Sequence, residues 1–301
     1  MLALARRGFT LAELLVALVI FGIVGTVIFR VLVSNQRLYT AQMQRIDLQD
    51  NLRTAAVLLP SELRELDASE GDIVAMAADS IRIRAMRQLT FVCQAPVLGG
   101  LLTGRTMIVR GTGPGTTLFF GSRNFVTTTD SLLVYYEGNS ASRSDDTWLL
   151  AQLTGVAPAN CPIPDGQAGQ QLTFNLQALG APQANVNGNI VVGAPVRGFE
   201  YNVTYRSYQA ADGKWYIGLR NAAGLTPLIG PLPGSTGLNL TYYDSLGAVT
   251  AVRTNVALIR VRIIGQTAQP VRGQVGPPKT PVDTMTTWIT LRNNLRRAVN
   301  N

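Results

Sequence analysis

The feature that most constrains this chain is an apolar run at its N-terminal end. Residues 9–29 contain a single charged side chain, that of Glu13. An α-helix rises about 1.5 Å per residue, so this run spans about 30 Å, the thickness of the hydrocarbon core of a bilayer. Arg6 and Arg7 precede the run and would hold that end on the cytoplasmic side, while Arg30 follows it. The sequence therefore predicts one membrane-spanning helix.

Three kinds of segment contain such a run. A secretory signal has a shorter apolar region, of about 7–15 residues, and a small-residue cleavage site after it. Here a helix-compatible stretch continues past the run instead. A plain single-pass anchor explains the length, but it offers no partner for Glu13, and a carboxylate at the centre of a membrane helix costs roughly 2.5–3.5 kcal/mol. The third kind of segment is indicated by the residues around Glu13.

The stretch GFTLAELLVAL, which begins at Gly8, resembles the cleavage and methylation motif of type IV pilins and type II secretion pseudopilins. In that family a short basic leader ends in glycine, and a prepilin peptidase in the membrane cuts after it and N-methylates the new first residue. The resemblance implies that Arg6 and Arg7 belong to the leader, that Gly8 ends it and that Phe9 becomes the methylated N-terminus. It also implies that Glu13 is the docking residue, paired with the α-amino group of a neighbouring subunit, because a desolvated charge needs a partner.

Beyond the apolar run the helical pattern continues. Leu48, Leu52, Ala55 and Leu59 recur at helical spacing, and Pro60 is expected to end or kink the helix. The predicted layout has four parts: a leader (1–8), the transmembrane or filament-core half of a helix (9–30), its amphipathic half (31–66), and a β-rich periplasmic domain (67–301).

After residue 71 the pattern changes to alternation with a period of two, which predicts antiparallel strands with one buried and one solvated face. The inward positions of three such stretches are Ile81, Ile83 and Ala85; Phe199, Tyr201, Val203 and Tyr205; and Ile259, Val261 and Ile263. Residues 154–170, 178–195 and 265–282 lack a pattern and are predicted to be loops. No boundary of a second domain is visible. The expected fold class is α+β and pilin-like, a long N-terminal helix packed on an antiparallel β-rich domain.

The residue types argue against catalysis and against a metal site. The chain has no histidine, which excludes Ser-His-Asp and Cys-His mechanisms and the usual zinc sites. Cys93 and Cys161 form no CxxC pair; they are available for a disulfide, or for two separate buried thiols. Asp145 and Asp146, with Asp130 nearby, are candidate calcium ligands, but their spacing fits no EF-hand loop and a solvated turn is expected. No cofactor and no metal are predicted.

The charge pattern gives little indication of an anionic partner. The formal net charge is +8, and 24 of the 26 basic residues are arginine. These arginines are scattered along the chain, without a basic stripe interleaved with aromatic residues, so nucleic acid is not expected as a partner.

The resemblance implies a non-catalytic minor pilin or pseudopilin, most similar to the J-type minor pseudopilins and the W-type minor pilins. Its partners would be the prepilin peptidase, other pilin or pseudopilin subunits and an inner-membrane assembly platform. It would sit in the inner membrane with one span and its C-terminal domain in the periplasm, and then in a filament or at its tip. The residues leave open whether this is a secretion pseudopilus or a type IV pilus. The rival functions are a pilin-like surface adhesin or DNA-uptake protein and, with less support, a membrane-tethered enzyme.

Overall fold

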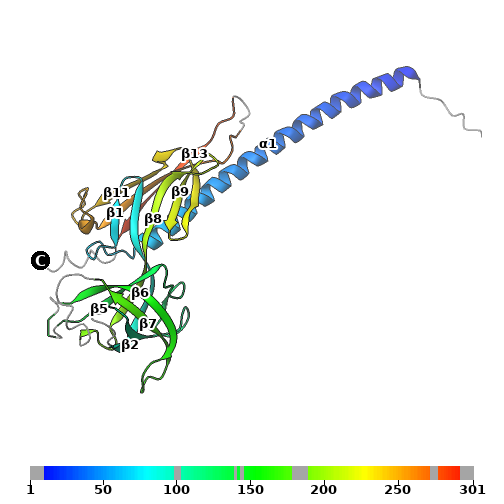
Figure 1. Ribbon diagram of the computed structural model, residues 1–301. Helices are drawn as coiled ribbons and strands as arrows, with labels where there is room; N and C mark the ends of the chain where they lie inside the picture. The colour runs from blue at the N-terminus through cyan, green and yellow to red at the C-terminus, as the bar shows by residue number, and fades with distance from the viewer. Residues whose placement is uncertain are drawn as a thin grey trace, which may run out of the picture.

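The computed structural model describes residues 10–97, 103–138, 141–142, 146–177, 189–271 and 277–291. Its first element is one continuous helix, α1 (Leu11–Leu63, 53 residues), whose N-terminal part projects away from a β-rich body (Figure 1). The side chains that α1 buries recur every three or four residues; they are Leu48, Leu52, Ala55, Leu59 and Leu63. The second half of the helix is therefore packed on the body, as its pattern predicts, and Leu48 is the first side chain that it buries.

The helix passes through Pro60, where the sequence predicts an end or a kink, and ends three residues later. Leu59 and Leu63 are both buried on either side of the proline, and each contributes about 1.5–3 kcal/mol of burial. The final turn closes with a bond of 3.0 Å from the Arg64 N–H to the Pro60 carbonyl. The burial of two leucines offsets the hydrogen bond that proline cannot donate.

After α1 the described residues form strands and two short 3-10 helices joined by turns and loops, and these strands pair in antiparallel fashion. The first group of strands is β1 (Ile73–Met76), β2 (Ser80–Val97), β3 (Arg105–Arg110), β4 (Phe120–Gly121), β5 (Asp130–Tyr136), β6 (Thr147–Asn160) and β7 (Ala168–Leu176). The second group is β8 (Pro195–Gln209), β9 (Trp215–Asn221), β10 (Gly224–Leu232), β11 (Leu238–Tyr243), β12 (Leu258–Gln266) and β13 (Val282–Thr290), with η2 (Ser235–Gly237) and η3 (Arg253–Asn255). The α+β class predicted from the sequence, a long helix on an antiparallel body, is confirmed.

These strands surround two separate hydrophobic cores. The first core defines a head lobe, in which α1 packs on β1, β9 to β13 and the adjoining halves of β2 and β8. The second core fills a barrel lobe made of β3, β5, β6, β7 and the other halves of β2 and β8. The barrel is closed, because the order β2–β3–β7–β6–β5–β8 returns to β2 through a direct β2–β8 pairing. Figure 1 shows this lobe beyond the C-terminal end of α1.

The two lobes meet where β2 and β8 cross from one core to the other. Gln88 and Gly198 are register partners at this crossing. A Cβ on Gly198 would lie 2.3 Å from Gln88 Oε1 and 2.6 Å from Phe125 Cε1, so the crossing leaves no room for a side chain there. The sequence shows no boundary within residues 67–301 because the lobes share two continuous strands and have no linker between them.

The crossing also breaks one of the predicted alternations. Inward positions in β2 and β12 are buried as expected, but in β8 Phe199 and Glu200 are both buried and Tyr201 is exposed. Asn202 has a φ of 65°, and the β2–β8 register shifts between Ile83 and Ala85. The interior position predicted for Tyr201 is wrong because β8 passes from one lobe to the other here. The side chain of Glu200 is buried in place of that of Tyr201.

One of the three predicted loops is a hairpin. Strands β6 and β7 pair from Ala151 opposite Leu176 to Asn160 opposite Ala168, so strand residues occupy much of the range 154–170 that was predicted to be a loop. Of the other two ranges, 178–188 and 272–276 lie outside the described residues. The remainder of 265–282 continues the hairpin of β12 and β13, with a bridge between Val271 and Lys279.

The barrel lobe contains a disulfide between Cys93 of β2 and Cys161, the residue after β6. Both cysteines are buried and lie 68 residues apart in the sequence. The bond therefore links the strand that enters the barrel to the turn between β6 and β7.

Candidate assembly site along the N-terminal helix

The first half of α1 has no protein around it. Its large apolar side chains from Leu11 to Phe29 are between 48% and 83% exposed. Among the described residues, α1 is the one helix long and apolar enough to cross a membrane. Exposing so many large apolar side chains to water is unfavourable, so this half of the helix requires lipid or other apolar helices around it. The chain is accordingly a membrane-anchored protein with one N-terminal span.

Glu13 caps the helix that contains it. Its Oε2 accepts bonds from Thr10 N at 2.9 Å and from Thr10 Oγ1 at 3.1 Å, and Glu13 N donates to Thr10 Oγ1 at 3.3 Å. This is a reciprocal capping box, which occupies two N–H groups at the start of the helix. An isolated anchor therefore does offer Glu13 a partner, contrary to the expectation from the sequence. The spacing Thr-x-x-Glu in the sequence is the signal that identifies Thr10 as the N-cap residue of α1.

The leader positions Arg6, Arg7, Gly8 and Phe9 lie outside the described residues. Within the span, a Cβ on Gly22 or Gly25 would meet no atom within 4 Å. Because glycine has no side chain, another helix can approach the backbone of α1 closely at these two positions.

An apolar face continues along α1 beyond the span. Tyr39, Met43 and Ile46 follow one another at intervals of four and three residues, and all three are exposed. Val57, further along the helix, is 72% exposed although its neighbours in the sequence are the partly buried Leu58 and the buried Leu59 of the head lobe. Helical spacing places the first three side chains on one face, which the head lobe does not cover.

The C-terminal end of α1 is tied to both lobes by a chain of ion pairs. Glu62 accepts two bonds from Arg87 Nη1 at 2.9 and 3.0 Å, and Arg87 Nε lies 3.4 Å from Glu200 Oε2. Arg123 Nη2 lies 3.8 Å from the same Glu200 oxygen, and its guanidinium forms two bonds of 2.6 Å with Asp130. Asp130 is fully buried and its pair with Arg123 is bidentate, the geometry in which a buried ion pair is best compensated.

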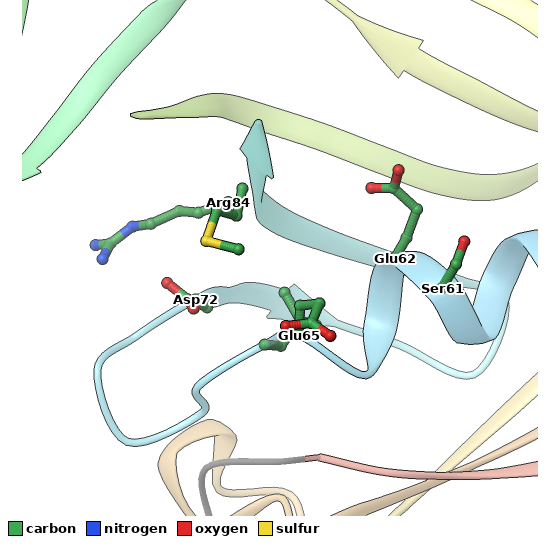
Figure 2. A pocket seen from close by; sticks show the side chains of 7 residues that line it. Ser61, Glu62, Glu65, Asp72 and Arg84 are labelled. Atoms are coloured by element: carbon green, nitrogen blue, oxygen red, sulfur yellow. The ribbon is translucent and has the colours of Figure 1, made fainter. Parts of the chain in front are cut away.

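A small polar pocket adjoins this chain of ion pairs. It is lined by Ser61 and Glu62 in the last turn of α1, by Glu65 just beyond it, and by Asp72 and Arg84 (Figure 2). Burial raises the pKa of the Asp72 carboxyl, although Arg197 Nη2 lies 3.2 Å from it and opposes that effect. Two acids of the pocket form ion pairs, Glu62 with Arg87 and Asp72 with Arg197. The described residues contain no group of three acids, histidines or cysteines placed to hold a metal ion.

The acids considered as calcium ligands are not brought together. Asp130 is bonded to Arg123, and Asp146 Oδ2 accepts a bond of 2.6 Å from Tyr135 Oη. Asp145 lies outside the described residues. The geometry therefore gives the described acids of this group structural partners.

Comparison with known proteins identifies the N-terminal segment. Residues 4–29 match the family model of the prokaryotic N-terminal methylation motif. No curated protein and no solved structure matches the chain. The motif is that of pilin-type proteins, which prepilin peptidase processes and which assemble with other pilin subunits. At its N-terminal end the chain therefore carries the motif of pilin-type proteins, followed by one apolar helix and an antiparallel body packed on the second half of that helix.

Proposed function

We propose that the chain is a non-catalytic minor subunit of a type II secretion pseudopilus or a type IV pilus. The observation that carries this proposal is the continuous exposed apolar face of α1, which extends past the membrane-length run to Tyr39, Met43 and Ile46. A plain anchor needs apolar side chains only within the bilayer. A helix that leaves the bilayer to pack among other helices also needs apolar side chains beyond the membrane-length run.

The proposal assigns a step to each residue of the N-terminal motif. The peptidase cuts between Gly8 and Phe9 and methylates Phe9, and Arg6 and Arg7 leave with the leader. The Glu13 carboxylate, which caps its own helix through Thr10 before assembly, then pairs with the α-amino group of a neighbouring Phe9. A charged amino group is a stronger partner than a neutral N–H, so the exchange favours the assembled state.

Assembly replaces lipid around residues 9–29 with other helices, and Gly22 and Gly25 allow their close approach. The positive leader holds the N-terminal end in the cytoplasm, which places the head and barrel lobes in the periplasm. An oxidising compartment supports the Cys93–Cys161 disulfide. The bulk of the two lobes supports a minor position, resembling J-type pseudopilins or W-type pilins.

Processing provides the first test. With a co-expressed prepilin peptidase, the mature protein should begin at methylated Phe9, and Gly8→Val should block cleavage because a branched side chain obstructs access to the backbone. Gly25→Ala is the matched control, since its Cβ meets nothing, and it should be cleaved normally. Intact mass and N-terminal sequencing give the answer; a mature terminus near residue 30 would refute the proposal.

The role of Glu13 can be separated from its capping bond. Glutamine at this position retains the capping box but has no charge, so Glu13→Gln should be inserted and cleaved normally yet enter filaments at least tenfold less than the wild type. Thr10→Ala removes the cap and keeps the charge, and it should assemble. Cross-linking to partner subunits measures both. Normal assembly of Glu13→Gln would show that the carboxylate only caps the helix.

A further inference from the structure

Three arginines from three strands meet on the outer face of the head sheet, by which we mean β1, β2, β8, β9 and β10 in the head lobe. Arg82 of β2 and Arg220 of β9 are both register partners of Thr204, and Arg206 follows Thr204 by two residues on β8. Strands lie about 4.8 Å apart and rise about 3.3 Å per residue, so the three Cα atoms form a triangle with sides of about 8–10 Å.

This face is turned away from α1 and is open to solvent. Side chains alternate across a strand, and the neighbours Ile81, Val203 and Tyr205 are buried in the core that contains α1. The three arginine side chains are exposed. The packing of α1 against other helices therefore leaves this surface accessible.

The three arginines have no acidic partner. In the part of the chain that the structure describes, none of them has a carboxylate oxygen within 4.0 Å. Two acids at the rim bond elsewhere: Asp79 accepts from Ser80 Oγ at 3.3 Å, and Asp212 accepts from Lys214 N at 3.0 Å and Tyr216 Oη at 2.8 Å. Like charges at this spacing repel one another, and an anion between them relieves that repulsion.

An aromatic ring lies beside the triangle. Tyr208 follows Arg206 by two residues on β8. The ring of Tyr208 lies over Gly218, which is the register partner of Arg206 on β9. A Cβ on Gly218 would stand 2.4 Å from Tyr208 Cε1 and 2.6 Å from Cδ1, so the ring occupies the space that any other residue would fill. The ring is half-exposed, so one side of it faces the sheet and part of it faces solvent.

We propose that this outer face, Arg82, Arg206, Arg220 and Tyr208, binds single-stranded nucleic acid. Guanidinium groups contact phosphates, and an aromatic ring stacks on unpaired bases without regard to sequence. A strand of nucleic acid supplies both an anionic backbone and planar rings, while an acidic polysaccharide or polypeptide supplies only the charge. A duplex keeps its bases stacked inside and leaves none for Tyr208.

The test uses the full chain in detergent micelles and a fluorescent oligo-dT of about 16 nucleotides, the upper end of the length that one small nucleic-acid-binding fold occupies. Fluorescence anisotropy should show binding whose log K falls with log salt at a slope of about −2, or about −0.7 for each of three phosphates. Arg82→Gln, Arg206→Gln and Arg220→Gln should each reduce the slope by about 0.7. Arg262→Gln, an exposed arginine on β12, is the matched control and should not change it.

The ring and the class of ligand are tested separately. Tyr208→Ala should weaken binding roughly 5- to 100-fold with the salt slope unchanged, and Tyr208→Phe should restore it. Unaltered thermal unfolding of each variant excludes a fold defect. Oligo-dT binding that persists in the triple arginine variant would overturn the proposal. So would equal competition by duplex DNA, by a sulfated polysaccharide or by poly-glutamate, because these lack unpaired bases. None of these outcomes bears on the cleavage at Gly8, so the proposed assembly function stands or falls independently.

Discussion

Cys93→Ala should lower the free energy of unfolding of the barrel lobe by about 4 kcal/mol. The disulfide closes a loop of 68 residues, and in the chain-entropy description a loop of this length restricts the unfolded chain by about that amount. Alanine is the appropriate replacement because both cysteines are buried and a serine hydroxyl would add its own burial cost. Hydrogen exchange of barrel amides during urea unfolding gives the value for this lobe separately from the head.

The matched controls come from the same bond. Cys161→Ala and the double variant should show the same loss as Cys93→Ala, because each removes one and the same cross-link. Head-lobe amides, which belong to a different core, should change much less. A loss below about 1 kcal/mol in all three variants would show that the cross-link does not limit the stability of the barrel.

Arg87→Met should also be severe and should lower the free energy of unfolding by about 3–5 kcal/mol. The substitution leaves Glu62, whose side chain is 25% exposed, without its cation, and leaves Glu200, which is 10% exposed, with Arg123 at 3.8 Å. The loss should be greatest near pH 7 and should shrink toward about pH 5. An unpaired buried carboxyl has a pKa raised above the usual value of about 4.3, so lowering the pH neutralises it in the folded state.

Arg53→Met is the control for this variant. Arg53 also pairs with an acid, Asp50 at 3.5 Å, but the two side chains are 77% and 63% exposed, so this loss should stay below about 0.5 kcal/mol. Urea unfolding at two pH values compares the variants. Equal losses in both, or a loss from Arg87→Met that does not depend on pH, would mean that the ion pairs at the end of α1 are not coupled to the fold as described.

The N-terminal helix and several strands were predictable because their signals are local. The apolar run of residues 9–29 and the alternations in β2 and β12 each need only a short window of sequence. The β6–β7 hairpin was not predictable in this way, because from Thr154 to Asn160 no side chain is buried and the alternation disappears. Pro158 and Gly155 then make the stretch resemble a loop.

The contacts of the candidate sites depend on register, which the sequence does not specify. The chain from Glu62 through Arg87 to Glu200 joins residues 138 positions apart, and nothing in their neighbours indicates the pairing. Arg82, Arg206 and Arg220 are scattered in the sequence but share one face once β2, β8 and β9 are aligned. The capping box of Thr10 and Glu13 is the exception, since its spacing is visible in the sequence.

The crossing at Gln88 and Gly198 has a consequence for how such a subunit can diversify. Chain enters and leaves the barrel lobe through two neighbouring antiparallel strands, and the Cα atoms of paired residues there are about 5 Å apart. The 109 residues between Gln88 and Gly198 connect these two strands in this chain. A tight turn could connect the same two strands across the same distance. The head lobe would retain its strand order with the barrel deleted, enlarged or exchanged for a different module. One membrane-anchored body can therefore carry different folds at its far end, without any change in the N-terminal helix.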